Sequence, residues 1–131
     1  MKSNKIVIVD YEMGNIHSIF KKLKNLGAKV LVSSKKEDIS TASKIILPGV
    51  GHFSKAMCNL KKLNLIEILN ENVIVKNKPI LGICLGMQLM SSYSEEGNSK
   101  GLNWVDGDVV SFKIKDNLRY KIPHIGWNQI N

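Results

Sequence analysis

Short apolar runs alternate with amphipathic stretches up to about residue 90 of the chain. Residues 5–10, KIVIVD, form an apolar run that ends in an acid, which is typical of a strand buried on both faces. From Ile16 to Leu26 the apolar residues recur at helical spacing with lysines between them, and Gly27 ends the predicted helix. The same reasoning predicts further strands at residues 29–32, 44–47 and 79–83, and further helices within residues 53–76 and at residues 85–90.

Strands that alternate with helices indicate βαβ units, and therefore an α/β fold with a mostly parallel sheet flanked by helices. The pattern changes beyond Ser94, where glycines and Pro123 separate short strand-like stretches such as residues 108–112. No repeat or low-complexity linker divides the chain, so residues 1–131 are interpreted as one domain. With 131 residues, of which 44% are hydrophobic, the chain is long enough to bury a core.

The net charge and the distribution of apolar residues indicate which classes of partner to expect. Nineteen Lys and Arg against eleven Asp and Glu give a formal net charge of +8, and Arg119 is the single arginine. Nucleic-acid grooves and phosphates are usually bound by the planar fork of arginine, so we expect no specific nucleic-acid partner. No apolar run approaches the roughly 18 residues that span a bilayer, so we expect no membrane partner.

The number of cysteines and the first residues of the chain indicate the cellular compartment. Cys58 and Cys84 are the two cysteines, and the first ten residues lack the pattern of a secretory leader. We therefore expect a cytoplasmic protein with reduced thiols, in which each cysteine is a core thiol or a nucleophile. No spacing of Cys and His matches a zinc site, so we expect no metal and no cofactor.

The segment Gly82-Ile83-Cys84-Leu85-Gly86 lies between a predicted strand and a predicted helix. It has the pattern of a nucleophile elbow, with cysteine in place of serine. In such a turn the nucleophile has a strained backbone, and the flanking glycines keep side chains away from it. The N–H of Leu85 is the natural first donor to an oxyanion, because it follows the nucleophile directly. The alternative is a buried cysteine at a strand end, with glycines that allow close helix–sheet packing.

A second glycine-rich turn, Pro48-Gly49-Val50-Gly51, follows the predicted strand at residues 44–47. Because ligands of open α/β sheets bind beyond the carboxyl ends of the strands, we expect this turn to lie on the same edge as Cys84. The backbone N–H groups of Gly49, Val50 and Gly51 are candidates for the second oxyanion donor. A plain strand-terminating turn is the alternative.

Six segments, in this order, resemble the class I glutamine amidotransferases, and among them the glutaminase subunits of imidazole glycerol phosphate synthase. The segments are DYEMGN at residues 10–15, PGVGHF at 48–53, GICLGMQ at 82–88, SEEG at 94–97, GL at 101–102 and PHIGWN at 123–128. The resemblance covers residues 5–131 and implies a flavodoxin-like α/β fold that is incomplete at its C-terminal end. Residues 1–131 would then form the N-terminal two-thirds of a glutamine amidotransferase domain.

The resemblance also implies an activity and a partner. Members of the family hydrolyse L-glutamine to glutamate and ammonia through a thioester on the elbow cysteine, here Cys84. In this subfamily the ammonia passes to a (β/α)8-barrel synthase subunit of histidine biosynthesis. Gln88, one helical turn after Cys84, would help to hold the glutamine, although an exposed helical glutamine is the alternative. Asn15 and Trp127 match positions that face the synthase, whereas the alternatives are a helix N-cap for Asn15 and a core aromatic for Trp127.

The general base of the family is absent from this chain. Class I amidotransferases supply it as a His-x-Glu pair in the last third of a longer chain, and no histidine here has an acid two positions later. His52 adjoins the glycine-rich turn, and His17 and His124 lie far from it in the sequence. We interpret the chain as a truncated or interrupted amidotransferase. The alternatives are one piece of a split enzyme and a non-catalytic remnant that binds a partner.

Two further functions share parts of this pattern. Paralogous amidotransferase subunits that supply ammonia for sugar amidination in surface-glycan synthesis carry the same motifs. Redox-sensing proteins with a cysteine elbow usually have a histidine directly after the cysteine, whereas Leu85 follows Cys84 here. The favoured prediction is the glutaminase subunit of imidazole glycerol phosphate synthase, and the surface-glycan paralogue, which the motifs do not separate from it, is the alternative.

Because the base is missing, the purified chain alone is expected to hydrolyse glutamine negligibly. A coupled assay of glutamate release checks this, with the Cys84→Ala variant as background. Rapid turnover by the wild-type chain that Cys84→Ala abolishes would contradict the prediction.

Overall fold

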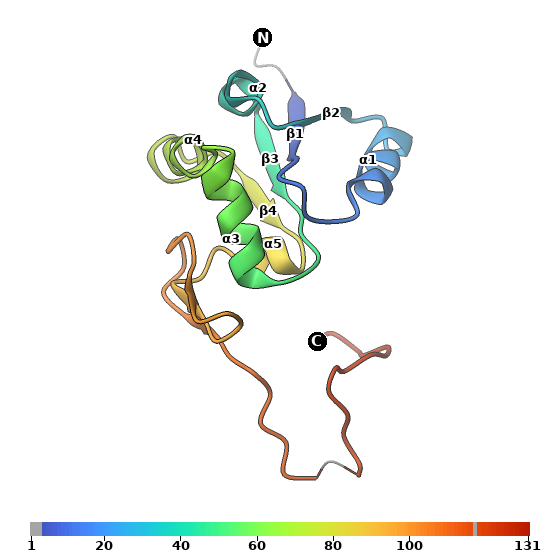
Figure 1. Cartoon of the computed structure of the whole chain (residues 1–131). Coiled ribbons are helices and arrows are strands. Elements are labelled where there is room, and N and C mark those ends of the chain that lie inside the picture. The colour runs from blue at the N-terminus through green and yellow to red at the C-terminus, as the bar shows by residue number, and fades with distance from the viewer. Residues whose placement is uncertain (1–3, 117) are drawn as a thin grey trace.

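The structure, a computed structural model, describes residues 4–116 and 118–131 of the chain. Its centre is a four-stranded parallel sheet in the order β2-β1-β3-β4 (Figure 1). The strands are β1 (Lys5–Val9), β2 (Lys29–Ser33), β3 (Lys44–Leu47) and β4 (Ile80–Gly82). The helices are α1 (Ile16–Asn25), α2 (Lys36–Thr41), α3 (Phe53–Lys62), α4 (Ile66–Asn70) and α5 (Leu85–Gln88), and a π-helical turn η1 (Glu71–Val75) continues α4. The predicted α/β fold with a parallel sheet is confirmed.

Strands are added to the sheet on both sides of β1. The crossover through α1 leads to β2 on one side, whereas the crossovers through α2 and through α3 and α4 lead to β3 and β4 on the other. Because such crossovers are right-handed, α1 covers one face and α2, α3 and α4 cover the opposite face (Figure 1). The strand order therefore reverses between β1 and β3, where open α/β sheets bind their ligands.

Two apolar layers follow from the alternation of side chains along each strand. The larger layer lies beneath α2, α3 and α4 and includes Val7, Val9, Ile45, Leu47, Phe53 and Leu60. The smaller layer lies beneath α1 and is built around Ile8, Val30 and Ile46. Since β1 contributes to both layers, its sequence is the continuous apolar run from which the strand was predicted.

The helical regions differ from the prediction in two places. No apolar periodicity indicates α2, because five of its six residues are polar and Ile39 is its one buried residue. α5 ends at Gln88 rather than at residue 90. Residues 53–76, predicted as one or two helices, form α3, α4 and η1. Within the described ranges, no helix is long and apolar enough to cross a membrane.

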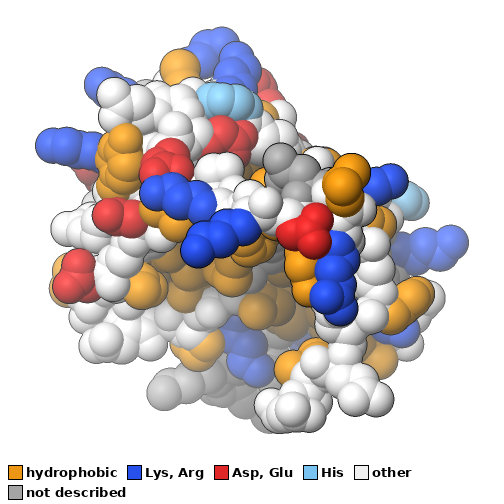
Figure 2. Space-filling view, turned by 90° about the horizontal axis from the view of Figure 1, so that it is seen from below, with side chains coloured by type: hydrophobic (Ala, Val, Ile, Leu, Met, Phe, Trp, Pro, Cys, Tyr) orange, Lys and Arg blue, Asp and Glu red, His pale blue; other side chains and the backbone are white. Residues whose placement is uncertain are grey.

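A second, small sheet follows α5 and has the order β6-β5-β7. Its strands are β5 (Tyr93–Ser94), β6 (Ser99–Lys100) and β7 (Asp108–Val109). Beyond Val109 the described residues form no helix or strand, and they lead away from the main sheet (Figure 1). Large apolar side chains are exposed along them, namely Val110, Phe112, Leu118, Tyr120, Ile122, Ile125, Trp127 and Ile130. Figure 2, viewed from the side of this segment, shows hydrophobic side chains in a hollow with both basic and acidic side chains around it.

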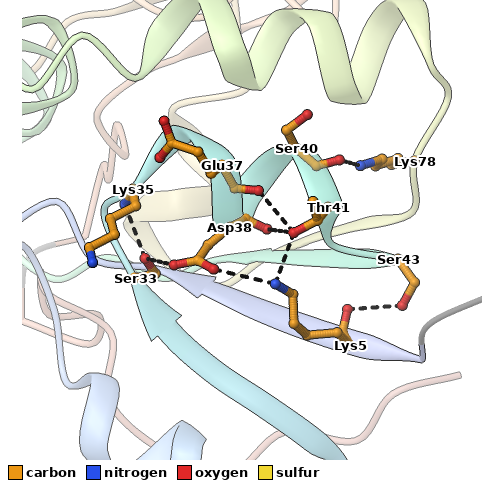
Figure 3. Close-up of polar contacts among 9 residues, drawn as sticks. All are labelled: Lys5, Ser33, Lys35, Glu37, Asp38, Ser40, Thr41, Ser43 and Lys78. Carbon is orange, nitrogen blue, oxygen red and sulfur yellow. Dashed lines mark hydrogen bonds and ion pairs between the residues drawn. The ribbon is translucent and has the colours of Figure 1, made fainter.

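A polar network fastens α2 to β1 and β2 (Figure 3). The Asp38 carboxylate accepts hydrogen bonds from Ser33 Oγ at 2.7 Å and from Lys5 Nζ at 3.4 Å. Lys5 Nζ also donates to Thr41 Oγ1 at 2.9 Å. The Ser33 hydroxyl, together with Lys5 and Lys35, holds the pKa of Asp38 below its usual value. A helix with little apolar surface is thus held by charged and polar side chains.

Replacing Asp38 by Asn is expected to lower the free energy of unfolding near neutral pH. Because the pKa of Asp38 is lowered in the fold, its stabilisation is present above about pH 4 and is lost as the pH falls through the lowered pKa. Urea unfolding at about pH 7 and about pH 2.5 checks this, with Asp106→Asn at an exposed position as the control. A loss of the same size at both pH values would contradict the account.

Candidate active site

Three loops meet at the carboxyl edge of the sheet, next to the point where the strand order reverses. They follow β1, β3 and β4, and their backbones lie in van der Waals contact. A Cβ atom added to Gly14 would lie 3.2 Å from Gly49 Cα, and one added to Gly49 would lie 2.9 Å from Gly86 N. The glycines therefore allow the three loops to touch. The Pro48–Gly51 turn and Cys84 lie on one edge, as their positions after parallel strands predict.

Cys84 forms a strained turn between β4 and α5. Its backbone has φ 54° and ψ −117°, a conformation that residues other than glycine rarely adopt. Its thiol is exposed, and its carbonyl accepts hydrogen bonds from the N–H groups of Met87 at 3.0 Å and Gln88 at 3.2 Å. This is the geometry of a nucleophile elbow, and the alternative of a buried strand-end cysteine is wrong.

The glycines on either side of Cys84 allow the backbone of α5 to rest on the sheet. A Cβ atom on Gly86 would overlap the carbonyl oxygen of Leu47 at the end of β3. A Cβ atom on Gly82 would lie 2.6 Å from Met87 Cα. Since backbone atoms have no rotamer by which to move aside, neither position accepts a side chain without displacing α5.

Tyr11 joins the first two loops and was not singled out by the sequence pattern. Its side chain is fully buried, and its hydroxyl donates to the carbonyl of Pro48. Its own carbonyl accepts a hydrogen bond from Asn59 Nδ2 of α3 at 3.1 Å. Burial, followed by the negative charge of the Cys84 thiolate, raises the pKa of Tyr11 well above its usual value. Tyr11 is therefore a neutral hydroxyl that fixes the glycine-rich turn close to Cys84.

Of the N–H groups expected to stabilise an oxyanion, that of Leu85 has a hydrogen-bond partner in this structure. Leu85 N–H donates to the carbonyl of Gly49 at 3.2 Å, and Gly86 N–H donates to the carbonyl of Ile83 at 3.0 Å. Gly49 thus directs an acceptor, rather than a donor, at the elbow. Val50 is exposed, and Gly51 has φ 122°. While Gly49 accepts this hydrogen bond, the Leu85 N–H is not free to bind another acceptor.

A cavity of about 520 Å³ is lined in part by Gln88 of α5, the helix that follows Cys84. The acids Glu95 and Glu96 line the same cavity, together with residues 109–111. Glu95 Oε2 accepts a hydrogen bond from Ser111 N at 2.8 Å, which ties the wall of the cavity to the β5–β6 turn. The periodicity of apolar residues did not identify Glu95 and Glu96 as site residues. They fall within the SEEG segment that carried the family resemblance.

His52 lies between the glycine-rich turn and this cavity. Its Nδ1 is 2.9 Å from Ser54 Oγ, and its Nε2 is 3.9 Å from Glu96 Oε1. The same Glu96 oxygen accepts a hydrogen bond from Phe53 N at the start of α3, at 3.3 Å. His52 and Glu96 therefore hold α3 and the β5–β6 turn together, and neither contact is with Cys84.

The two residues predicted at a partner interface, Asn15 and Trp127, are both exposed. Asn15 occupies the N-cap position of α1, but its side chain makes no capping hydrogen bond. Trp127 is fully exposed, so the alternative of a core aromatic is wrong. The structure leaves both side chains accessible from solvent.

Among the described residues, no histidine makes a hydrogen bond with Cys84. His124 Nε2 is 2.8 Å from Asn128 Nδ2, within the C-terminal segment, and His17 is exposed on α1. Among the residues that the structure describes, no group of three or more His, Cys, Asp or Glu side chains could hold a metal ion. Cys58 and Cys84 are both free thiols.

The parallel sheet, the strained cysteine and the glycine-rich turn define an α/β protein with a cysteine nucleophile elbow. A solved structure described as "Crystal structure of glutamine amidotransferase" superposes with a TM-score of 0.67, covering 79% of this chain and 55% of that one at 19% identity. Residues 7–130 match the family "Glutamine amidotransferase class-I". The chain belongs to the class I glutamine amidotransferase family.

Within this family, the curated relatives below are subunits of one enzyme. The chain is 48% identical over 126 residues to "Imidazole glycerol phosphate synthase subunit HisH 2" of Pseudomonas aeruginosa, covering 96% of this chain and 61% of the relative. It is 47% identical over 125 residues to the protein of that name from Methanococcus maripaludis, covering 95% of this chain and 61% of the relative. A HisH subunit of Staphylococcus aureus is 46% identical over 125 residues, with 62% of its length covered. The chain thus spans about three-fifths of the length of these relatives.

Replacing Gly86 by Ala is expected to lower the free energy of unfolding by about 1–3 kcal/mol, because the new Cβ overlaps the Leu47 carbonyl. Gly107→Ala is the matched control, since nothing lies within 4 Å of a Cβ atom there, and it should change stability by less than about 0.5 kcal/mol. Denaturant unfolding of the two variants measures the difference. Equal effects at the two positions would contradict the close approach of α5 and β3.

Proposed function

We propose that this chain carries the nucleophile of a glutaminase, and that it belongs to the glutaminase subunit of imidazole glycerol phosphate synthase in the cytoplasm. The observation that carries the proposal is the backbone of Cys84, which is held in an elbow against a glycine-rich turn. The identity of 46–48% to HisH subunits supports the assignment to this synthase. Two free thiols agree with a reducing compartment.

The proposed chemistry begins with attack of the Cys84 thiolate on the carboxamide carbon of glutamine. A C–S bond forms, the C–N bond breaks, and the nitrogen leaves as ammonia after taking up a proton. Water then attacks the thioester, which releases glutamate and returns the thiol. The exposed thiol allows the substrate to reach the sulfur. The proton transfers need a base, and we propose that it lies on polypeptide outside this chain, because none of the described histidines makes a hydrogen bond with Cys84.

The oxyanion of this reaction would form beside Leu85. Its N–H group is directed at the carbonyl of Gly49, so the chain is in a resting arrangement. If the peptide between Gly49 and Val50 turns over, the Leu85 N–H is released and the Val50 N–H enters the site. Gly51, with φ 122°, is a neighbouring position where the backbone can absorb the rotation.

The cavity beside Gln88 suits the amino-acid end of glutamine. Gln88 offers an amide to the substrate, and Glu96 offers a carboxylate that complements an α-ammonium group. Gln88 ends the short helix α5, which begins directly after Cys84. We assign the substrate to this cavity.

The ammonia would pass to a (β/α)8-barrel synthase subunit. Asn15 and Trp127 are the residues proposed to face it, and both are exposed. Figure 2 shows a hydrophobic hollow with charged side chains of both signs around it, and the net charge of +8 suits a partner with an acidic face. Docking there would contact the C-terminal segment and the edge of the sheet that carries the site.

Acivicin, an electrophilic analogue of glutamine, is expected to alkylate Cys84 in the purified chain at a pH near the ordinary pKa of a thiol. Intact-mass and peptide mass spectrometry measure the adduct. Cys58→Ser is the matched control, because Cys58 is the other exposed free thiol, and it should label as the wild type does. Cys84→Ser should abolish labelling. Equal labelling of the two cysteines, or excess glutamine without effect, would contradict the proposal.

A further inference from the structure

Glu96 is the acid proposed to pair with the α-ammonium group of glutamine, and its side chain is held from one side. Its Oε1 atom accepts a hydrogen bond from Phe53 N, at the first residue of α3, at 3.3 Å. Its own N–H group donates to Ser94 Oγ, at the end of β5, at 3.1 Å. The hydrogen bonds among the described residues leave Glu96 Oε2 without a partner. One carboxylate oxygen is therefore fixed on α3, and the other is free to meet a ligand.

His52 lies beside the fixed oxygen of Glu96. Its Nε2 atom is 3.9 Å from Glu96 Oε1, which is longer than a direct hydrogen bond, so the contact is electrostatic. Its Nδ1 atom is 2.9 Å from Ser54 Oγ, which restricts rotation of the ring. Nε2 carries a hydrogen in the protonated ring, and also in the neutral ring whose Nδ1 accepts the Ser54 hydrogen. In both forms the ring presents a positive group to the carboxylate.

The backbone after Glu96 packs against the same ring. Gly97 has φ 80°, and a Cβ atom added there would lie 2.7 Å from His52 Cε1 and 2.5 Å from Ser54 Oγ. The imidazole is 53% exposed and the carboxylate 43% exposed, and an ion pair with this exposure contributes little to stability. The consequence of the contact is therefore the position of Glu96 rather than the stability of the fold.

His52 is placed to act on a ligand through Glu96 and not directly. The described residues that line the cavity include Gln88 and Glu96 but not His52. His52 directly follows Gly51 and occupies the N-cap position of α3, so it joins the glycine-rich turn to the helix that holds Glu96. A substrate in the cavity would therefore contact Glu96, and His52 would set where that carboxylate lies.

We propose that His52 is a positioning residue for the recognition of glutamine. Together with Phe53 N–H, its ring holds Oε1 of Glu96 at the start of α3, which leaves Oε2 to pair with the α-ammonium group of the substrate. The inference rests on the proposed function. It concerns one end of the substrate, so His52 affects the discrimination between glutamine and 4-carbamoylbutanoate, which has the same carboxamide and carboxylate but no amino group.

Protection of Cys84 from iodoacetamide tests the proposal in the full chain. Peptide mass spectrometry gives the concentration of each compound that halves the alkylation rate. His52→Ala is expected to raise this concentration about three- to tenfold for glutamine, and to leave it within about twofold for 4-carbamoylbutanoate. Glu96→Gln should raise the glutamine value at least about tenfold. The double variant should be no weaker than Glu96→Gln alone, because His52 acts through Glu96.

Two conservative variants separate positioning from a purely structural role. The side-chain amide of glutamine reaches the place of Nε2, and that of asparagine reaches the place of Nδ1. His52→Gln should therefore restore most of the affinity for glutamine, whereas His52→Asn, which keeps the contact with Ser54, should not. His17→Ala is the matched control, because His17 is exposed on α1, on the other face of the sheet, and it should behave as the wild type does.

Without ligand, all of these variants should be alkylated at Cys84 at the wild-type rate, and circular dichroism should show them folded. Equal losses for the two compounds, unchanged protection in His52→Ala, or rescue by His52→Asn instead of His52→Gln would overturn the role of His52 and leave the glutamine site standing. Absence of protection by either compound in the wild type would overturn the proposed glutamine site, and this inference with it.

Discussion

The contact between the backbone of α5 and the end of β3 is the constraint on which the rest of the site depends. A Cβ atom at Gly86 would overlap the Leu47 carbonyl, so glycine alone lets the helix begin against the sheet. This approach forces the chain to reverse sharply at Cys84, where φ is 54°. The strain is held by the surrounding structure, and it exposes the thiol at the carboxyl edge of the sheet.

The three loops that follow β1, β3 and β4 are also held together by close contacts. Tyr11 is buried between the β1 loop and the glycine-rich turn, and its hydroxyl donates to the Pro48 carbonyl. The next residue, Gly49, directs its carbonyl at Leu85 N–H. The glycine-rich turn and the elbow are therefore joined by a backbone hydrogen bond as well as by close packing.

The sequence predicted those parts of the molecule that depend on local patterns. Apolar runs located the strands, and glycines at fixed spacing around Cys84 identified the elbow. Local patterns do not report tertiary neighbours, so Tyr11 was missed although its hydroxyl fixes the turn. The sequence pattern did not predict α2. Hydrogen bonds to Lys5 and Ser33, rather than an apolar stripe, hold this helix to the sheet. Local patterns likewise do not predict the hydrogen bond from Leu85 N–H to the carbonyl of Gly49, because the two residues are 36 positions apart in the sequence.

The central claim is that Cys84 lies next to a site for glutamine. The rate at which iodoacetamide alkylates each cysteine, followed by peptide mass spectrometry with and without glutamine, tests this most directly. Cys58 is an internal standard, because it is also an exposed free thiol. The account predicts that glutamine slows alkylation of Cys84 and leaves that of Cys58 unchanged. Unchanged rates at both cysteines in saturating glutamine would contradict it.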